Sequence, residues 1–229
     1  MPTTGIVDVH ASDGVCDLAR FISEDGGVLF IQKATEGVDF SDRAYQTVAP
    51  RVLGAGLLLG LYHFGNGNDP IKQADHFLRA TEAFPSAVPI LDCEKNEDSD
   101  YGTMSFDQAA AFLESFYRRR GVRPMFYTYE HLLHTEVLKA RPESRLSLAQ
   151  SPLWIAKYGP PPKAIPKEWA AWKSWTLWQY SSSVNNGPAD QSVYPRGFKS
   201  FARKSQDRSV FSGTPEELRN LWKTLRERE

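Results

Sequence analysis

Residues 89–95 read PILDCEK, a short apolar run that ends in two carboxylates separated by one residue. Side chains alternate across an extended strand, so Asp92 and Glu94 share one face while Leu91 and Cys93 share the other. The rise of a strand places the α-carbons of the two acids about 6.6 Å apart. Two carboxylates at this separation repel each other, so one of them tends to hold its proton near neutral pH.

An apolar run with a polar or aromatic end recurs along the chain, and amphipathic segments separate the runs. Near-continuous apolar runs are typical of parallel strands that are covered on both faces. We expect strands at 5–10, 28–37, 57–65, 89–95, 124–129, 153–159, 175–181 and 207–211. The helical patterns cover 16–25, 42–53, 70–84, 105–120 and 214–229.

This alternation of strands and helices predicts the fold class. Eight strands with five or six helices indicate an α/β fold, a closed and partly irregular β/α barrel of the TIM-like kind. The length of 229 residues suits one such barrel, so we expect a single domain over residues 1–229. A doubly wound open sheet is the alternative, but no glycine-rich phosphate loop follows the first strand.

Composition and charge argue against several classes of function. The formal net charge is −1, from 27 basic and 28 acidic residues, which argues against a nucleic-acid binder. No apolar run approaches the length of a membrane span, and the first residues lack the pattern of a secretory signal. Cys16 and Cys93 are expected to be free buried thiols, and neither they nor His131 and His134 have metal-ligand spacing. We therefore expect no metal site, no membrane insertion, and synthesis in the cytoplasm.

In a closed barrel the carboxyl ends of parallel strands meet at one rim, where such folds keep their chemistry. The polar and aromatic residues at or near those ends include Asp8, Lys33, Glu36, Tyr62, Asp92, Glu94, Tyr127 and Gln179. We therefore expect a functional cluster at this rim. A protonated acid beside an ionised acid is the minimum equipment for cleaving a glycosidic bond. The alternative is a buried acid pair that Lys33 or Lys95 neutralises.

Eight short motifs follow one another along the chain. They are GIVDVH (5–10), KATEG (33–37) with DFSD (39–42), GLYHF (60–64), LDCE (91–94), YT (127–128), LWIAKY (153–158), WQY (178–180) and DRSVFSGTPEEL (207–218). In this order they resemble glycoside hydrolase family 25, the muramidases or lysozymes of the Chalaropsis type. Each motif alone is a weak signal, but eight in order, over nearly the whole chain, are specific.

The resemblance implies a modified eight-stranded β/α barrel with fewer helices than strands. It also implies hydrolysis of the β-1,4 bond between N-acetylmuramic acid and N-acetylglucosamine in peptidoglycan, without a metal or an organic cofactor. Peptidoglycan glycan strands would then be the partner. We expect a monomer that acts on the cell wall after release or delivery, and the sequence leaves open a phage lysin, a delivered effector and a secreted enzyme.

The resemblance assigns roles where motif matches motif. Glu94 matches the general acid that protonates the leaving oxygen, and Asp92 matches the carboxylate that stabilises the developing positive charge or orients the acetamido group. Asp8 and Asp207 match the other acids of the cluster. The matches to groups lining the sugar cleft are Tyr62, Tyr127, Trp154 and Gln179, and Lys33 and Glu36 match the pair in KATEG that shapes the site.

Three positions depart from the family's pattern. They are His10 where Ser is common, Ser209 where Asn is common, and Leu18 where Trp is common. None of them removes a carboxylate, so we expect the activity to be retained. Either Asp190 or Asp207 could be the fourth acid, because similar motifs follow both; we prefer Asp207 because GTPEEL and the final helix follow it directly.

A polar loop from 181 to 206 follows the seventh expected strand and is longer than usual for such connections. Its basic residues include Arg196, Lys199, Arg203 and Lys204. We hypothesise that this loop overhangs the cleft and attracts the carboxylates of peptidoglycan stem peptides. A solvated surface loop is the alternative.

Two rival functions remain for such a barrel. One is a catalytically silent glycan-binding protein, which is disfavoured because no acidic position of the cluster is lost. The other is a different barrel glycosidase, such as a chitinase. It is disfavoured because VPILDCE (88–94) supplies only the last two acids of the longer chitinase signature.

Overall fold

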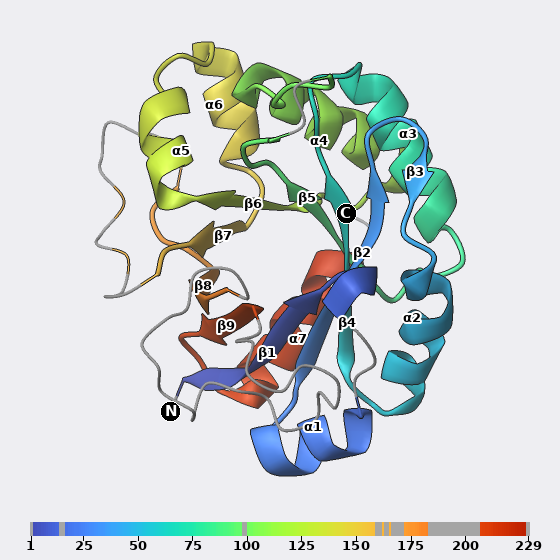
Figure 1. Ribbon diagram of the computed structural model, residues 1–229. Helices are drawn as coiled ribbons and strands as arrows, with labels where there is room; N and C mark the ends of the chain where they lie inside the picture. The colour runs from blue at the N-terminus through green and yellow to red at the C-terminus, as the bar shows by residue number, and fades with distance from the viewer. Residues whose placement is uncertain are drawn as a thin grey trace.

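The computed structural model describes residues 2–13, 17–97, 100–158, 162, 165, 172–182 and 207–227. Within this part, eight strands form a closed barrel and a ninth, β3, extends one edge (Figure 1). The order around the ring is β1-β9-β8-β7-β6-β5-β4-β2, and pairing between β1 and β2 closes it. The predicted TIM-like barrel with fewer helices than strands is confirmed, and the open-sheet alternative is wrong.

The elements follow the expected alternation closely. The strands are β1 (Thr3–Val9), β2 (Leu29–Glu36), β3 (Phe40–Ser41), β4 (Leu58–Phe64), β5 (Val88–Asp92), β6 (Met125–Tyr129), β7 (Leu153–Ala156), β8 (Leu177–Ser181) and β9 (Asp207–Phe211). The helices are η1 (Ala11–Asp13), α1 (Leu18–Asp25), α2 (Ala44–Gly54), α3 (Pro70–Thr81), α4 (Phe106–Arg120), α5 (Glu130–Glu136), α6 (Pro142–Leu148) and α7 (Pro215–Arg226). No described helix is long and apolar enough to cross a membrane.

The last strand departs from a parallel barrel. The other seven strands of the ring run parallel to one another, whereas β9 is antiparallel to both β1 and β8. The amino end of β9 therefore lies at the rim where the other strands have their carboxyl ends. As a result Asp207, the first residue of β9, stands directly opposite Asp8 of β1.

Local signals at the helix ends fix where the helices α3 and α4 begin and stop. The Asp69 carboxylate accepts hydrogen bonds from the first turn of α3, and Pro70 supplies a backbone angle suited to the first helical residue. At α4, Ser105 and Gln108 form a reciprocal capping box, and Gly121 ends the helix in a left-handed conformation at φ 68°. The two helices pack together on the outer face of the barrel, beside β4 and β5 (Figure 1).

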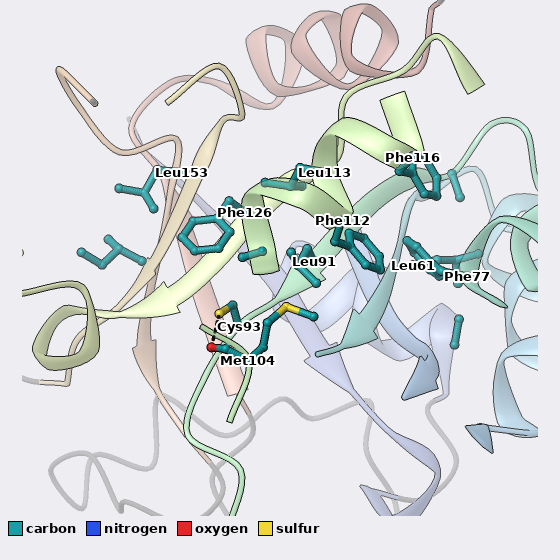
Figure 2. Close-up of a cluster of buried hydrophobic side chains, with 14 of the residues drawn as sticks. Leu61, Phe77, Leu91, Cys93, Met104, Phe112, Leu113, Phe116, Phe126 and Leu153 are labelled. Carbon is teal, nitrogen blue, oxygen red and sulfur yellow. Dashed lines mark hydrogen bonds between the residues drawn. The ribbon is translucent and has the colours of Figure 1, made fainter. Parts of the chain in front are cut away.

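Two layers of apolar side chains divide the core. In the outer layer, Leu91 and Cys93 belong to the same buried cluster as Phe112 and Leu113 of α4 (Figure 2). Ile90 belongs instead to the cluster inside the barrel. Because side chains alternate along a strand, this arrangement directs the face shared by Asp92 and Glu94 into the barrel mouth.

The described cysteine is a structural thiol. Cys93 is buried, unpaired, and donates its S–H to the Met104 carbonyl at 3.6 Å (Figure 2). Burial raises the pKa of the thiol well above its ordinary value, so it stays protonated. Cys16 lies outside the described residues.

Helix α7 closes the end of the barrel opposite the rim. Trp222 is fully buried in the inner cluster with Leu29 and Val88. Its indole N–H donates to the carbonyl of Leu59, near the amino end of β4, at 2.8 Å. An aromatic of this size with a satisfied N–H fixes the helix against the barrel floor.

A buried histidine ties the loop after β4 to the barrel. The Thr35 hydroxyl lies 2.8 Å from His63 Nδ1, and His63 Nε2 lies 3.1 Å from the Gln73 side-chain oxygen. Since that oxygen can only accept, Nε2 donates to it and Nδ1 accepts from Thr35. The imidazole ring also stacks on Phe112, with centroids 5.0 Å apart. Gln73 in turn bonds the backbone of Asn66.

This histidine makes the fold sensitive to acid. Burial lowers the pKa of His63 from 6.5 to about 3, so the unfolded chain binds its proton first as the pH falls. Its contribution to stability is complete above pH 6.5 and is lost progressively below it. Between pH 7.5 and 5.0 we expect the free energy of unfolding to fall by about 2 kcal/mol from this residue. Urea unfolding of the wild type and His63→Gln at the two pH values measures the difference. Equal pH dependence in both proteins would contradict the assignment.

Candidate active site

An open pocket at the barrel rim brings the acids together. Its volume is about 260 Å³. The side chains that line it are Asp8, His10, Lys33, Tyr62, Phe64, Asp92, Glu94, Tyr127, Trp154, Gln179 and Asp207. We call it the acid pocket. Apart from Glu36, every site residue expected from the sequence lines it.

The barrel delivers the carboxylates from three strands. Asp8 lies near the carboxyl end of β1, Asp92 ends β5, and Glu94 follows two residues later. Asp207 begins β9 and reaches the same rim because that strand is antiparallel. Segments far apart in the sequence thus place like charges around one opening, an arrangement that stability alone does not favour.

Two residues of the lining were not in the predicted set. His10 follows the end of β1 and Phe64 ends β4, so both stand at strand ends. Their position at a strand end is the feature of the sequence from which both could have been predicted as site residues. Phe64 forms part of the pocket wall, and the Nζ of Lys33 lies 5.0 Å from the centre of the Phe64 ring.

A hydrogen-bond network orients Asp8. The Gln179 amide N–H donates to Asp8 Oδ2 at 2.9 Å. Its carbonyl oxygen accepts from the hydroxyls of Tyr127 at 2.9 Å and Tyr158 at 3.1 Å. One orientation of the Gln179 amide serves both tyrosine hydroxyls as acceptor and the Asp8 carboxylate as donor. The network therefore fixes this amide and, through it, the carboxylate of Asp8. Tyr158 lies two residues beyond the end of β7, although the sequence predicts a strand that extends over 153–159 and includes it.

Trp154 lies beneath the acids in the floor of the pocket. Only 2% of the residue is exposed, and its ring centre lies 4.5 Å from that of Tyr127. Its indole N–H donates to the hydroxyl of Ser209 at 2.9 Å. Ser209, one of the three departures from the family's pattern, therefore holds the floor in place. Trp154 presents little surface to stack on a sugar.

Lys33 forms an ion pair with an acid other than Asp92 and Glu94. Its Nζ lies 2.6 Å from a carboxylate oxygen of Glu36, and Lys95 pairs with Glu97 at 3.1 Å. In the described part of the chain, no ion pair joins either lysine to Asp92 or Glu94. Neither lysine therefore neutralises the acid pair by direct contact in the described residues, although Lys33 lowers the pKa of both acids.

Burial is the main cause of the raised pKa values of Glu94, Asp92 and Asp8. The pKa of Glu94 is raised from 4.5 to about 7, first by burial and second by the nearby charge of Asp207. Burial also raises the pKa of Asp92, with Glu94 as the next cause, and that of Asp8, with Asp207 as the next cause. Mutual repulsion, the cause expected from the sequence, therefore comes second to removal from water.

Two buried carboxylate oxygens in the pocket lack a hydrogen-bond partner within the described part of the chain. Asp8 Oδ1 and Asp92 Oδ1 are buried, and neither has a hydrogen-bond partner among the described residues. A buried acceptor without a donor is costly, so such atoms are expected to be protonated or to meet a donor from outside the protein. Hydroxyl and amide N–H groups of a sugar are donors of that kind.

The comparisons with known proteins give the family. Residues 7–187 match the family model described as glycosyl hydrolases family 25. The chain belongs to this family. The resemblance indicated by the motifs is confirmed, and the chain is classed among the glycoside hydrolases.

Three relatives illustrate the family 25 similarity. The autolytic lysozyme of Clostridium acetobutylicum is 28% identical over 197 residues, which cover 83% of this chain and 56% of the relative. Lysozyme M1 of Streptomyces globisporus is 27% identical over 219 residues, which cover 88% of this chain and 70% of the relative. The crystal structure of the bacterial lysozyme of Streptomyces coelicolor has a TM-score of 0.75 at 23% identity and covers 96% of each chain, which shows a shared fold.

A second depression adjoins the acid pocket of this family 25 chain. Its volume is about 600 Å³, and its lining comprises Glu94, Lys95, Glu97, Tyr129, Glu130, His131, Ala156, Lys157 and Tyr158. We call it the side pocket. Glu94 lines both depressions, so its carboxyl group stands at the boundary between them.

Among the described residues, no group of three or more His, Cys, Asp or Glu side chains is placed to hold a metal ion. Asp190 lies outside the described residues, as do the basic residues of the 181–206 loop, Arg196, Lys199, Arg203 and Lys204. Asp207 lines the acid pocket, where the fourth acid of the cluster was expected.

Proposed function

We propose that this family 25 protein is a muramidase, which hydrolyses the β-1,4 bond between N-acetylmuramic acid and N-acetylglucosamine in peptidoglycan. The observation that carries the proposal is the place of Glu94: its carboxyl group borders two depressions and has a pKa of about 7. A glycosidic bond has a sugar on each side, and its leaving oxygen needs a proton at neutral pH. The lysozyme names of the relatives support the same substrate.

In this proposal Glu94 is the general acid. The sugar that acquires positive charge occupies the acid pocket, and the departing sugar occupies the side pocket. Glu94, protonated in the free enzyme, donates its proton to the oxygen between them. Asp92 lies on the acid-pocket side of that bond and, once ionised, stabilises the oxocarbenium charge or orients the acetamido group.

The other residues shape the acid pocket around that sugar. Asp8 and Asp207 add negative charge on the β1–β9 side, where cationic character on a sugar ring is favoured. Burial raises the pKa of the Tyr62 and Tyr127 hydroxyls, which therefore remain neutral donors. The groups come from one chain, so a monomer suffices, and the substrate places the action at the cell wall.

Analysis of the products tests this function. Purified peptidoglycan digested with the protein should yield fragments with N-acetylmuramic acid at the new reducing end, identified by mass spectrometry after borohydride reduction. N-acetylglucosamine at that end would overturn the proposal in favour of a different glycosidase. The absence of any fragment would overturn it in favour of a glycan-binding barrel.

The pH dependence of hydrolysis follows from the state of Glu94. Because the pKa of Glu94 is about 7, its carboxyl group is protonated below that pH and loses its proton above it. We expect kcat/KM on a soluble glycan fragment to fall by about tenfold per pH unit above neutrality. In Asp207→Asn this decline should begin at a lower pH, because Asp207 is the charge that most raises the pKa of Glu94. A decline that stays in the same place in the variant would contradict this coupling.

A further inference from the structure

A third pocket lies at the end of the barrel opposite the acids. It is lined by Leu78, Arg79, Glu82, Pro85, Arg119, Arg120, Val122 and Arg226, and its volume is about 420 Å³. We call it the arginine pocket. Its walls come from the last turns of α3, α4 and α7 and from the segments that lead into β5 and β6. Those segments meet the amino ends of the strands, whereas the acid pocket lies at the carboxyl ends of β1 and β5.

Two of the four arginines are held by the protein. Arg120 donates to the backbone carbonyls of Thr81 and Phe84 and to the Thr81 hydroxyl. Arg119 forms an ion pair with Asp75. A cation at the carboxyl end of a helix offsets the negative end of the helix dipole, and Arg120 has this role at the last residue of α3.

The other two arginines are not accounted for in this way. Neither Arg79 nor Arg226 forms an ion pair with any residue in the described ranges, and both are exposed on the pocket wall. Four arginines and one carboxylate, Glu82, line the hollow, and Arg119 pairs with an acid outside the lining, Asp75. Charges of one sign in a concave surface with apolar walls concentrate the electrostatic potential there.

We propose that the arginine pocket binds a phosphate group carried by a small organic moiety, as in a phosphate ester or a phosphodiester. Guanidinium groups present paired donors that match the oxygens of a phosphate, and a phosphate offers more oxygens to converging donors than a carboxylate does. The pocket volume falls within the range of small-ligand sites, roughly 300–1,000 Å³. Leu78, Pro85 and Val122 supply an apolar wall against which the carbon part packs.

Calorimetric titration with two phosphate probes tests the proposal on the full chain. One probe is glycerol phosphate, and the other is a short glycerol-phosphate polymer. We expect saturable binding of glycerol phosphate, and an Arg79→Ala/Arg226→Ala variant should weaken it by about tenfold or more. Glu82→Gln should tighten it by about twofold, because it removes the one opposing charge of the lining. A higher affinity per phosphate for the polymer would identify a polyanion as the source, and equal affinity a free phosphate ester.

The matched control removes the same charge elsewhere. Arg20 and Arg141 are exposed arginines on other faces, so Arg20→Ala/Arg141→Ala should leave phosphate binding unchanged. Equal weakening in both double variants would overturn the proposal in favour of general charge attraction, and so would the absence of saturable binding to the wild type. Hydrolysis of a soluble glycan fragment should be the same in Arg79→Ala/Arg226→Ala as in the wild type. The outcome is therefore independent of the muramidase test.

Discussion

Replacement of Glu94 by Gln is expected to lower the rate of peptidoglycan hydrolysis by about 10²- to 10⁴-fold. The amide has nearly the shape of the protonated acid and can occupy the same place between the acid pocket and the side pocket. It has no proton of suitable acidity to give to a leaving oxygen. Release of soluble reducing sugars from purified peptidoglycan measures the loss.

A stability measurement shows whether the loss comes from unfolding. Because folding raises the pKa of Glu94 above its ordinary value of 4.5, this residue contributes fully to stability below pH 4.5. The contribution is lost as the pH rises through about 7. Gln removes the penalty of a buried charge at high pH, so at pH 8 the variant should be more stable than the wild type by on the order of 2 kcal/mol. Glu143→Gln, at an exposed position of α6, should hydrolyse at the wild-type rate. Near wild-type hydrolysis by Glu94→Gln would remove its assignment as the general acid.

Replacement of Asp92 by Asn is expected to give the second largest effect, a decrease in kcat of about 10²-fold. Asn preserves the volume of the side chain but removes the negative charge that faces the developing oxocarbenium ion. Because that charge matters most in the transition state, KM should change much less than kcat. Steady-state kinetics on a soluble glycan fragment separates the two quantities.

The control for Asp92 exchanges the same groups at a remote position. Asp107→Asn, on α4, replaces a carboxylate that accepts from the backbone of Arg141 and should leave kcat unchanged. If Asp92→Asn raised KM alone, Asp92 would serve to bind the substrate in its ground state, and the stabilising role proposed for it would be wrong.

The sequence predicts the barrel because its strands are strongly apolar and end in polar residues. Leu91 and Cys93 pack toward α4, and this apolar requirement of the outer layer fixes the opposite direction for Asp92 and Glu94. The motif matches extend the set to Asp8, Gln179 and Asp207, which line the same pocket. A local rule, the alternation of faces along a strand, is enough to orient these side chains once the barrel is closed.

Features that depend on tertiary contacts could not be predicted from the sequence. The antiparallel direction of β9 follows from pairing with β1 and β8, which no local pattern in residues 207–211 specifies. Helix α6 has seven residues, about two turns, too few for a clear amphipathic period. The dominance of burial over repulsion in the pKa of Glu94 depends on the surrounding side chains, which the spacing of two acids does not reveal.

The proposed mechanism requires Glu94 to be protonated near neutral pH in the free protein. The direct measurement is ¹³C NMR titration of glutamate side-chain carboxyl groups, with Glu94→Gln used to assign the resonance. We expect a midpoint of about 7 for this resonance. A midpoint near 4.5, the ordinary value for a glutamate, would contradict it.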